Sequence, residues 1–541
     1  MSKLWRSNTF RFFLLFCISV LIRVIPMRKW VYGLDEAFYL IDTSFIFGEI
    51  TPGAGSKPGY AFMLGIIFII LNTQHPFFIR LLTVIFTSFL PFVGYSFGKK
   101  LGGEKIGWLT GLFLAFHHKI FDFSYWIMTD IPFTFLTFLS IYFILLNFEK
   151  LENSESNKRF PFIAGILCGL SDLVRQAGIY LILLTILLYF LTKGINLRQK
   201  FDNAIRFFVG VTSMLLPWFL WSYIHLGVLD PTLEYVATTP SPTYITLFSR
   251  LLYYVVQIPG MVLGFHLINQ YQVTFSAIII SIGVCLIIII GLVNGYSQNK
   301  LLTRITILST LLLLIFLLIL EYQVTRYFYP IIPLLAPFLF IGLFKTKDIM
   351  ISAIKYISNR STICFKKKGL FSFHGKFHLL INLMFIAAIL LPNIVADTLA
   401  NKNYLSTDDM VVTSPLWRAY IEAALWVKET SDPQDKVITF KNFDFEYYSQ
   451  RKCIAPSQQI YSEYFRNNKQ AYVTELMSYM YANNITHVVI GPFGYTDNLL
   501  FWLSDPNTAP SYVEAIYLRN SPKVIIYLIQ WSTFMTTSPF A

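Results

Sequence analysis

Long apolar runs separated by short polar segments cover most of the chain. A helix needs about 20 apolar residues to cross a hydrocarbon core of about 30 Å, and runs such as Phe207 to Leu226 and Thr274 to Val293 have that length. The pattern predicts eleven membrane-spanning helices. We expect them at residues 10–26, 76–98, 105–118, 130–148, 161–174, 176–192, 207–226, 274–294, 303–320, 327–344 and 378–396.

Two apolar segments fit this scheme poorly. Gly59 to Leu71 is shorter than a membrane span, and Leu251 to Leu267 is interrupted by Pro259, Gly260 and Gly264. We interpret both as interfacial or re-entrant helices on the outer face. Counting both as spans would give thirteen and would leave the C-terminus on the same side.

From residue 397 the pattern changes to alternating helical and strand periodicity. Helices are expected at residues 416–429 and 472–483, and strands at 436–440, 487–490 and 523–529. The predicted fold class is therefore an all-α polytopic membrane protein with about 11–13 transmembrane helices and a small C-terminal α/β domain. The expected domains are residues 1–396 and 397–541.

Composition and charge agree with a membrane protein. The chain is 55% hydrophobic and 13% charged, whereas soluble domains have about 25% charged residues. The net charge of +13 could indicate a nucleic-acid partner, but residues 397–541 hold 11 Lys/Arg and 14 Asp/Glu. The excess of positive charge lies in the membrane part, where basic residues mark cytoplasmic loops. We therefore expect no nucleic-acid partner.

The distribution of basic residues also predicts the orientation of the chain. Lys3, Arg6 and Arg11 precede the first span and place the N-terminus inside. The densest cluster, Lys345 to Lys376, has eight basic residues and one acidic residue and is expected to contact anionic lipid headgroups inside. An odd number of spans then puts residues 397–541 outside. We expect a multi-pass plasma-membrane protein with an extracytoplasmic C-terminal domain.

Cysteine and motif content narrow the chemistry. Five Cys residues show no metal-ligand spacing, and Cys453 is the only one after residue 396. A disulfide within the C-terminal region is therefore excluded, and redox chemistry is not expected. The sequence has no Gly-rich phosphate loop and no HExxH motif.

Charged residues recur at the predicted outer ends of the spans. The pair Asp35-Glu36 follows the first span, Lys57 precedes the short apolar segment, and Asp130 begins a span. Carboxylates this close to hydrocarbon are costly unless they are paired or used. Each residue also has a structural interpretation: a solvated loop for Asp35 and Glu36, a snorkelling side chain for Lys57 and a helix N-cap for Asp130. All of them, with Arg326, fall on one face.

The order of these motifs resembles a known superfamily. Asp35-Glu36, Lys57-Pro58-Gly59-Tyr60, Arg80-Leu81, Met128 to Pro132, and Arg326-Tyr327 with Pro330 and Pro333 follow one another as in the C superfamily of glycosyltransferases (GT-C). Within it, the chain is similar to glycosyltransferase family 39, which includes protein O-mannosyltransferases and lipid A aminoarabinose transferases. The resemblance covers roughly residues 10–345.

That resemblance implies an activity and a set of site residues. The activity is inverting transfer of a sugar from a polyprenyl (dolichyl- or undecaprenyl-type) phosphate to a hydroxyl of an acceptor protein, lipid or glycan at the outer face. Asp35 would be the general base, and Glu36 and Asp130 would organise the acceptor. The residues implied to bind the donor phosphate are Lys57, Arg80, Arg326 and Tyr327.

The chain departs from its relatives at one position of these motifs, and the sequence does not support a metal site. Many relatives have a second Pro where this chain has Gly59. Some relatives bind a metal, and His266 could be a ligand, but a lone His in an apolar segment is more often a packing residue. His117 and His118 could simply mark the membrane interface. We expect no cofactor and assign no metal site.

Two other classes of protein remain open from the sequence. A transporter or flippase for lipid-linked sugars would also place charges in its membrane domain. A catalytically silent scaffold would use its outer domain to bind partners. Because the candidate charges gather at the outer face rather than through the depth of the bilayer, we favour the enzyme.

Overall fold

The computed structural model describes most of the chain. The described residues are 8–25, 27, 39–40, 57–73, 75–153, 158–192, 195–231, 247–264, 268–269, 272–273, 275–319, 325–360, 384, 386–399, 415–439, 442–455, 469–491, 503, 509–521 and 523–537. They form two compact units, one of membrane helices and one built mainly from residues 403–541.

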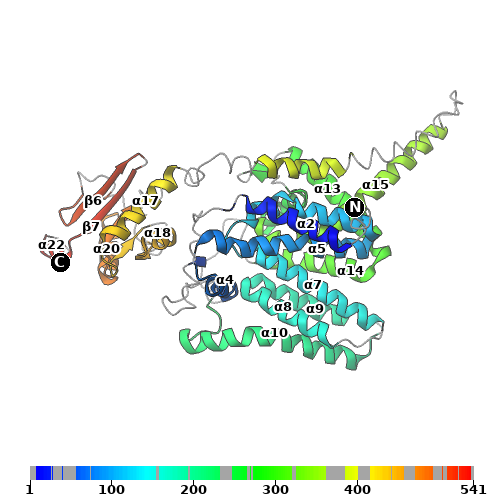
Figure 1. Ribbon diagram of the computed structural model, residues 1–541, viewed down its shortest axis with the longest axis horizontal. Coiled ribbons are helices and arrows are strands. Elements are labelled where there is room, and N and C mark those ends of the chain that lie inside the picture. Colours follow the sequence, from blue (N-terminus) through cyan, green and yellow to red (C-terminus); the bar gives the residue numbers. More distant parts are fainter. Residues whose placement is uncertain are drawn as a thin grey trace. The chain divides into compact units, whose positions relative to one another are not determined.

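The first unit is a bundle of helices that lie side by side (Figure 1). The apolar runs form helices because a helix satisfies its own backbone hydrogen bonds where no water is present. The helices are α2 (Asn8–Val24), α4 (Pro58–Leu71), α5 (Pro76–Ala115), α6 (His118–Ser124), α7 (Asp130–Glu152), α8 (Arg159–Val174), α9 (Ile179–Leu191), α10 (Leu197–Leu226), α12 (Leu247–Leu263), α13 (Phe275–Gln298), α14 (Lys300–Ile319), α15 (Ile331–Arg360) and a helix at Ile386–Leu399.

Several of these helices can cross a membrane. Among the described residues, five helices are long and apolar enough to do so alone, namely α5, α7, α10, α13 and α14. Shorter apolar helices accompany these five helices. The chain is a polytopic membrane protein with a small C-terminal sheet, which confirms the predicted fold class.

Helix α5 contains two of the predicted spans. Its backbone leaves helical geometry at Gly102 and at Gly103, whose φ is +74°. A Cβ on Gly94 would lie 2.3 Å from the side chain of Leu114, and one on Gly98 would lie 2.8 Å from the carbonyl oxygen of Ile106. The two arms therefore pack antiparallel, with glycines at their contact. They match the predicted spans 76–98 and 105–118.

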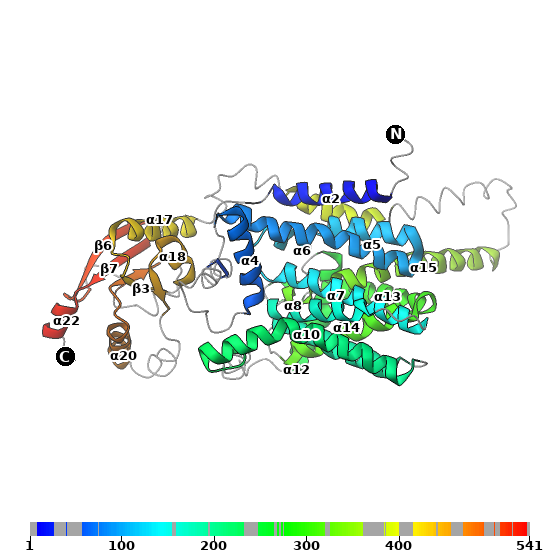
Figure 2. The same ribbon diagram turned by 60° about the horizontal axis from the view of Figure 1, so that its bottom comes forward.

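The two segments interpreted as interfacial form the helices α4 and α12. Helix α4 runs across the axis of its neighbours (Figure 2) and exposes Phe62 and Ile69. At the start of α12, Arg250 donates to the carbonyl of Leu318 near the end of α14 at 2.9 Å. At its other end, the carbonyl of Leu263 accepts from Asn393 at 3.0 Å. The two ends of α12 thus contact the end of α14 and the middle of the helix at Ile386–Leu399.

The second unit contains a five-stranded mixed sheet with the order β4-β3-β5-β7-β6. Strand β3 pairs parallel with β4 and β5, whereas β7 pairs antiparallel with β5 and β6. The strands are β3 (Lys436–Ile438), β4 (Lys452–Ile454), β5 (His487–Ile490), β6 (Val513–Asn520) and β7 (Lys523–Ile529). The helices are α17 (Pro415–Thr430), α18 (Asn442–Ser449), α20 (Lys469–Ala482) and α22 (Trp531–Thr537). The core lies between β5, β7 and α20.

The predicted elements of this unit agree with the observed ones. The expected helices at 416–429 and 472–483 correspond to α17 and α20, and the three expected strands correspond to β3, β5 and β7. The sequence did not predict β4, β6, α18 or α22. The expected domain boundary between residues 396 and 397 stays a prediction, since residues 400–414 lie outside the described residues.

Candidate functional site

An ion-pair cluster lies where α7 begins and α8 ends. Asp130 is the first residue of α7, and Arg175 is the C-cap residue of α8. Nη1 of Arg175 donates to Oδ1 of Asp130 at 2.5 Å. Nε of Arg326 lies 3.9 Å from the same oxygen. Two cations thus share one carboxylate, and we call Asp130, Arg175 and Arg326 the arginine cluster.

Two short 3₁₀ turns hold the arginines in place. After α8, the chain turns through η1 (Gln176–Gly178), and η2 (Thr325–Phe328) carries Arg326 and Tyr327. The guanidinium of Arg175 lies over the ring of Tyr327, 3.9 Å from its centroid, in a cation–π contact. The side chain of Arg326 also reaches Sδ of Met128 at 3.8 Å. Residues from three distant segments therefore meet here.

Exposure differs between the carboxylate and the two cations. The side chain of Asp130 is 2% exposed, whereas Arg175 is 16% and Arg326 is 26% exposed. An approaching ligand therefore meets the guanidinium groups, with the carboxylate beneath them. Guanidinium groups bind phosphate or carboxylate through two parallel hydrogen bonds. The arrangement suits a ligand with a negative charge.

A second cluster surrounds Lys57 at the start of α4. The Lys57 ammonium lies 3.4 Å from Oδ2 of Asp172 and also donates to Asp230. All three side chains are buried. One cation here faces two carboxylates, so the lysine compensates charges that would be costly in an apolar environment. We call these three residues the lysine cluster.

Close backbone packing brings the lysine cluster together. A Cβ on Gly59 would lie 2.7 Å from the backbone carbon and oxygen of Leu173, and one on Gly178 would lie 2.4 Å from the backbone nitrogen of Asp172. No residue with a side chain fits at Gly59 without movement. The departure from the Pro of many relatives thus has a physical reason, because Gly59 lets α4 contact the end of α8.

Other polar contacts join helix ends at this same end of the bundle. Arg23, near the end of α2, is fully buried and donates to the carbonyl of Ala115 at the end of α5 at 2.8 Å. Nδ1 of His118 lies 2.8 Å from Oδ1 of Asp397. Hydrogen bonding satisfies the terminal carbonyls of α5, which have no partner within their own helix. We call this end of the bundle the site face.

The structure places the expected site residues in different surroundings. Asp130, Arg326 and Tyr327 lie together in the arginine cluster. Lys57 lies in the lysine cluster, and Arg80 is fully buried in the first turns of α5. The expected base Asp35 and its neighbour Glu36 lie outside the described residues. Asp130 does not act as the N-cap, which is Thr129; its carboxylate instead pairs with arginine.

Sequence reasoning missed three residues of these clusters: Asp172, Arg175 and Asp230. A signal existed for the first two, since Ser171 to Arg175 carries two opposite charges at the end of a predicted span. Ionisable residues in such places are usually paired or functional. Asp230 follows α10 closely, but nothing local in the sequence connects it to Lys57.

His117 and His118 make polar contacts within the bundle. Nδ1 of His117 accepts from the backbone N–H of Ile120 and caps α6. His118 contacts Asp397 and, more distantly, Asp122. Within the described part of the chain, no group of three or more His, Cys, Asp or Glu side chains could hold a metal ion. His266 lies outside that part.

Part of the chain is similar to a known protein family. A family model described as dolichyl-phosphate-mannose-protein mannosyltransferase matches residues 54–223, which include Lys57, Asp130, Asp172 and Arg175. Comparison with curated protein sequences gives no match.

Solved structures of membrane glycosyltransferases share the fold. ArnT from Cupriavidus metallidurans, solved bound to undecaprenyl phosphate, aligns with a TM-score of 0.62 and 12% identity over 96% of this chain and 98% of its own. The oligosaccharyltransferase AglB from Archaeoglobus fulgidus, solved with an inhibitory peptide and a dolichol-phosphate, aligns with a TM-score of 0.58 and 14% identity over 97% of this chain and 75% of its own. The chain has the fold of the GT-C membrane glycosyltransferases, as the sequence resemblance implied.

Proposed function

We propose that the protein is an inverting glycosyltransferase. It moves a sugar from a polyprenyl-phosphate donor to a hydroxyl of a protein, lipid or glycan at the outer face of the plasma membrane. The family match and the two neighbours support this class, since ArnT was solved with undecaprenyl phosphate and AglB with a dolichol-phosphate. In this proposal the site face is the outer face.

One observation carries the proposal. The arginine cluster presents two partly exposed guanidinium groups over one buried carboxylate at a membrane face. A polyprenyl phosphate keeps its lipid chain in the bilayer and its phosphate at the surface, where cationic partners are needed. Arg175 and Arg326 would bind the donor phosphate, and Asp130 would hold both in place.

The reaction then needs an activated acceptor. The acceptor oxygen attacks the anomeric carbon, and the bond from that carbon to the phosphate oxygen breaks. Polyprenyl phosphate leaves with the electron pair, and the hydroxyl proton passes to a carboxylate, which we assign to Asp35. Cations at the phosphate stabilise the charge that develops on the leaving group. A single displacement inverts the anomeric centre.

We also propose roles for the remaining expected residues, and the contacts of the described ones limit what they can do. Tyr327 would act through Arg175, on which its ring lies. Lys57 would contact the phosphate only if it shared its ammonium between the ligand and the carboxylates of Asp172 and Asp230. Glu36 would organise the acceptor, and Arg80 would add positive charge from its buried position.

Product analysis tests this proposal. Purified protein in liposomes is incubated with a labelled polyprenyl-phosphate hexose or pentose and with candidate acceptor peptides, lipids or glycans. We expect label in an acceptor, free polyprenyl phosphate in equal amount, and an inverted anomeric configuration. Label that changes leaflet but stays on its lipid would instead identify a flippase and would contradict the proposal.

A further inference from the structure

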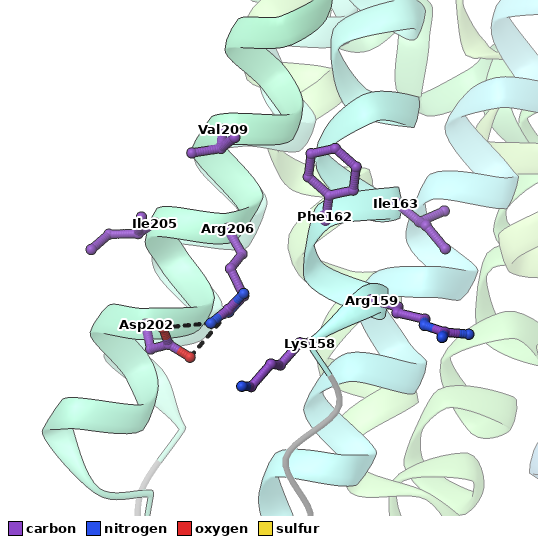
Figure 3. A pocket seen from close by; sticks show the side chains of 8 residues that line it. All are labelled: Lys158, Arg159, Phe162, Ile163, Asp202, Ile205, Arg206 and Val209. Carbon is purple, nitrogen blue, oxygen red and sulfur yellow. Dashed lines mark hydrogen bonds and ion pairs between the residues drawn. The ribbon is translucent and has the colours of Figure 1, made fainter.

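A cavity at the opposite end of the bundle from the site face has no role in the proposed transfer. It lies between α8 and α10, has a volume of about 570 Å³, and is drawn in Figure 3. Helix α8 runs from Arg159 at the cavity to Arg175 at the site face. At about 1.5 Å per residue, these ends are about 24 Å apart along the helix. The cavity therefore belongs to the other leaflet.

Glycine contacts explain why the two helices enclose a cavity. A Cβ on Gly165 would lie 2.1 Å from the carbonyl oxygen of Phe207, and one on Gly210 would lie 2.4 Å from that of Phe162. The helices run parallel and touch backbone to backbone at this crossing. Toward their N-termini, larger side chains separate them. The opening lies there.

The polar end of the cavity carries an excess of positive charge. Its lining includes Lys158, Arg159 and Arg206 but one acidic residue, Asp202. Arg206 holds Asp202 with two hydrogen bonds of 3.1 Å, from Nε and Nη2. Lys158 and Arg206 extend into the space between the helices (Figure 3). Because Arg206 pairs with Asp202, the positive charge of Lys158 remains for a singly charged anion.

The rest of the cavity is apolar and leads along α10. Phe162, Ile205 and Val209 are 38%, 47% and 54% exposed. A second groove of about 540 Å³ shares Ile205 and Val209 and continues to Leu216 and Pro217. A ligand with a charged head and a long apolar tail fits both parts, because its head meets the cations while its tail follows α10 toward the bilayer centre.

We propose that this cavity binds one anionic glycerophospholipid of the surrounding bilayer, its phosphate between Lys158 and Arg206 and one acyl chain in the groove along α10. Basic pockets between transmembrane helices on the cytoplasmic side bind anionic headgroups, and the positive charges of this region predict that side. The inference does not depend on the proposed glycosyl transfer. A zwitterionic lipid such as phosphatidylcholine has the same phosphate, but its own ammonium group cancels the charge, so we expect the cations to bind it more weakly.

The test uses the full-length protein in nanodiscs of phosphatidylcholine with increasing phosphatidylglycerol. Bound lipid is counted by native mass spectrometry after release into mild detergent. Each cation near an anionic surface contributes about 1 kcal/mol, so the double variant Lys158→Gln/Arg206→Gln should bind phosphatidylglycerol roughly 30-fold more weakly. Arg304→Gln, at an exposed position in the first turns of α14, is the matched control and should bind as the unchanged protein does.

Two further variants keep the test decisive if the double variant folds poorly. Val209→Trp fills the groove at an exposed position and should weaken binding without a change of charge. Asp202→Asn removes the competing carboxylate and should strengthen binding. The proposal is overturned if folded variants retain phosphatidylglycerol as the unchanged protein does, if phosphatidylcholine is retained equally well, or if polyprenyl phosphate displaces phosphatidylglycerol at equal concentration.

Discussion

Arg175 and Asp130 close the end of an antiparallel helix pair with an ion pair of 2.5 Å between Nη1 and Oδ1. Farther along the same pair, the hydroxyls of Thr137 and Ser171 lie 3.0 Å apart. The charged contact fixes the C-cap residue of α8 against the first residue of α7, the helix before it. Since Arg326 approaches the same carboxylate oxygen, Asp130 sets the positions of two cations at once.

This arrangement predicts strong coupling between Asp130 and Arg175. In a double-mutant cycle with Asp130→Asn and Arg175→Gln, we expect a coupling energy of about 1–3 kcal/mol in the free energy of unfolding. The pair Asp202 and Arg206 is the matched control because both side chains are at least one third exposed, and exposed helix pairs couple by about 0.3–0.5 kcal/mol. Equal coupling in both cycles would remove Asp130 from its proposed positioning role.

Replacing Lys57 should lower the folding stability of the protein, apart from any effect on ligand binding. Lys57→Met leaves Asp172 and Asp230 without their shared cation, and loss of one partner of a buried pair costs about 3–5 kcal/mol. Lys99→Met, at a half-exposed pair with Glu104, should cost almost nothing. Thermal unfolding followed by light scattering compares the two.

The double variant Lys57→Met/Asp230→Asn separates folding from binding. It removes one cation and one carboxylate, so part of the lost stability should return. If donor affinity stays low in this variant although its stability is restored, Lys57 contacts the phosphate. If donor affinity returns with stability, Lys57 only positions the chain.

Gly59 should tolerate no side chain. Gly59→Ala places a methyl group 2.7 Å from the backbone of Leu173, and overpacking of this kind costs about 1–3 kcal/mol. Gly283→Ala is the control, since a Cβ there meets no atom within 4 Å and alanine favours a helix over glycine by about 1 kcal/mol. A melting temperature that rises in both variants would contradict the packing described for Gly59.

The sequence predicted the elements more fully than the contacts. Hydrophobic runs and alternation locate most helices and three strands because these patterns are local. Strand β6 escaped prediction because it is an edge strand on which half of the residues are exposed and the register is irregular at Ala515. Strand β4 has three residues, too few for a periodic signal.

The candidate site was predictable only in part. The motif order grouped Asp130 with Arg326, and the structure brings these two residues together. The partners of Lys57 lie 115 and 173 positions along the chain, a separation that no local pattern reveals. Asp172 and Arg175 stand close together at the end of a predicted span, but the role of Arg175 depends on how α7 and α8 pair, which the sequence does not show.

Sidedness can be tested with engineered thiols. Cys453 is a poor reporter, because it is buried and its burial raises the pKa of the thiol well above the usual value. In a cysteine-free background, Glu429→Cys at the exposed end of α17 should react with a membrane-impermeant maleimide in cells with a permeable outer barrier. Arg304→Cys should react only after the membrane is opened. The reverse pattern would place the C-terminal unit inside.

The most direct test of the central claim is a kinetic comparison of Arg326→Gln and Asp35→Asn with the unchanged enzyme, using a polyprenyl-phosphate sugar as donor. Loss of a charge-assisted hydrogen bond of about 1.5–3 kcal/mol should raise the donor KM of Arg326→Gln by roughly 10- to 150-fold. Loss of a general base should lower the kcat of Asp35→Asn by about 10²- to 10⁴-fold with little change in donor KM. The variant Glu36→Gln tests whether Glu36, the neighbour of Asp35, is the base instead. Donor KM and kcat that stay at the unchanged values in all three folded variants would contradict the account.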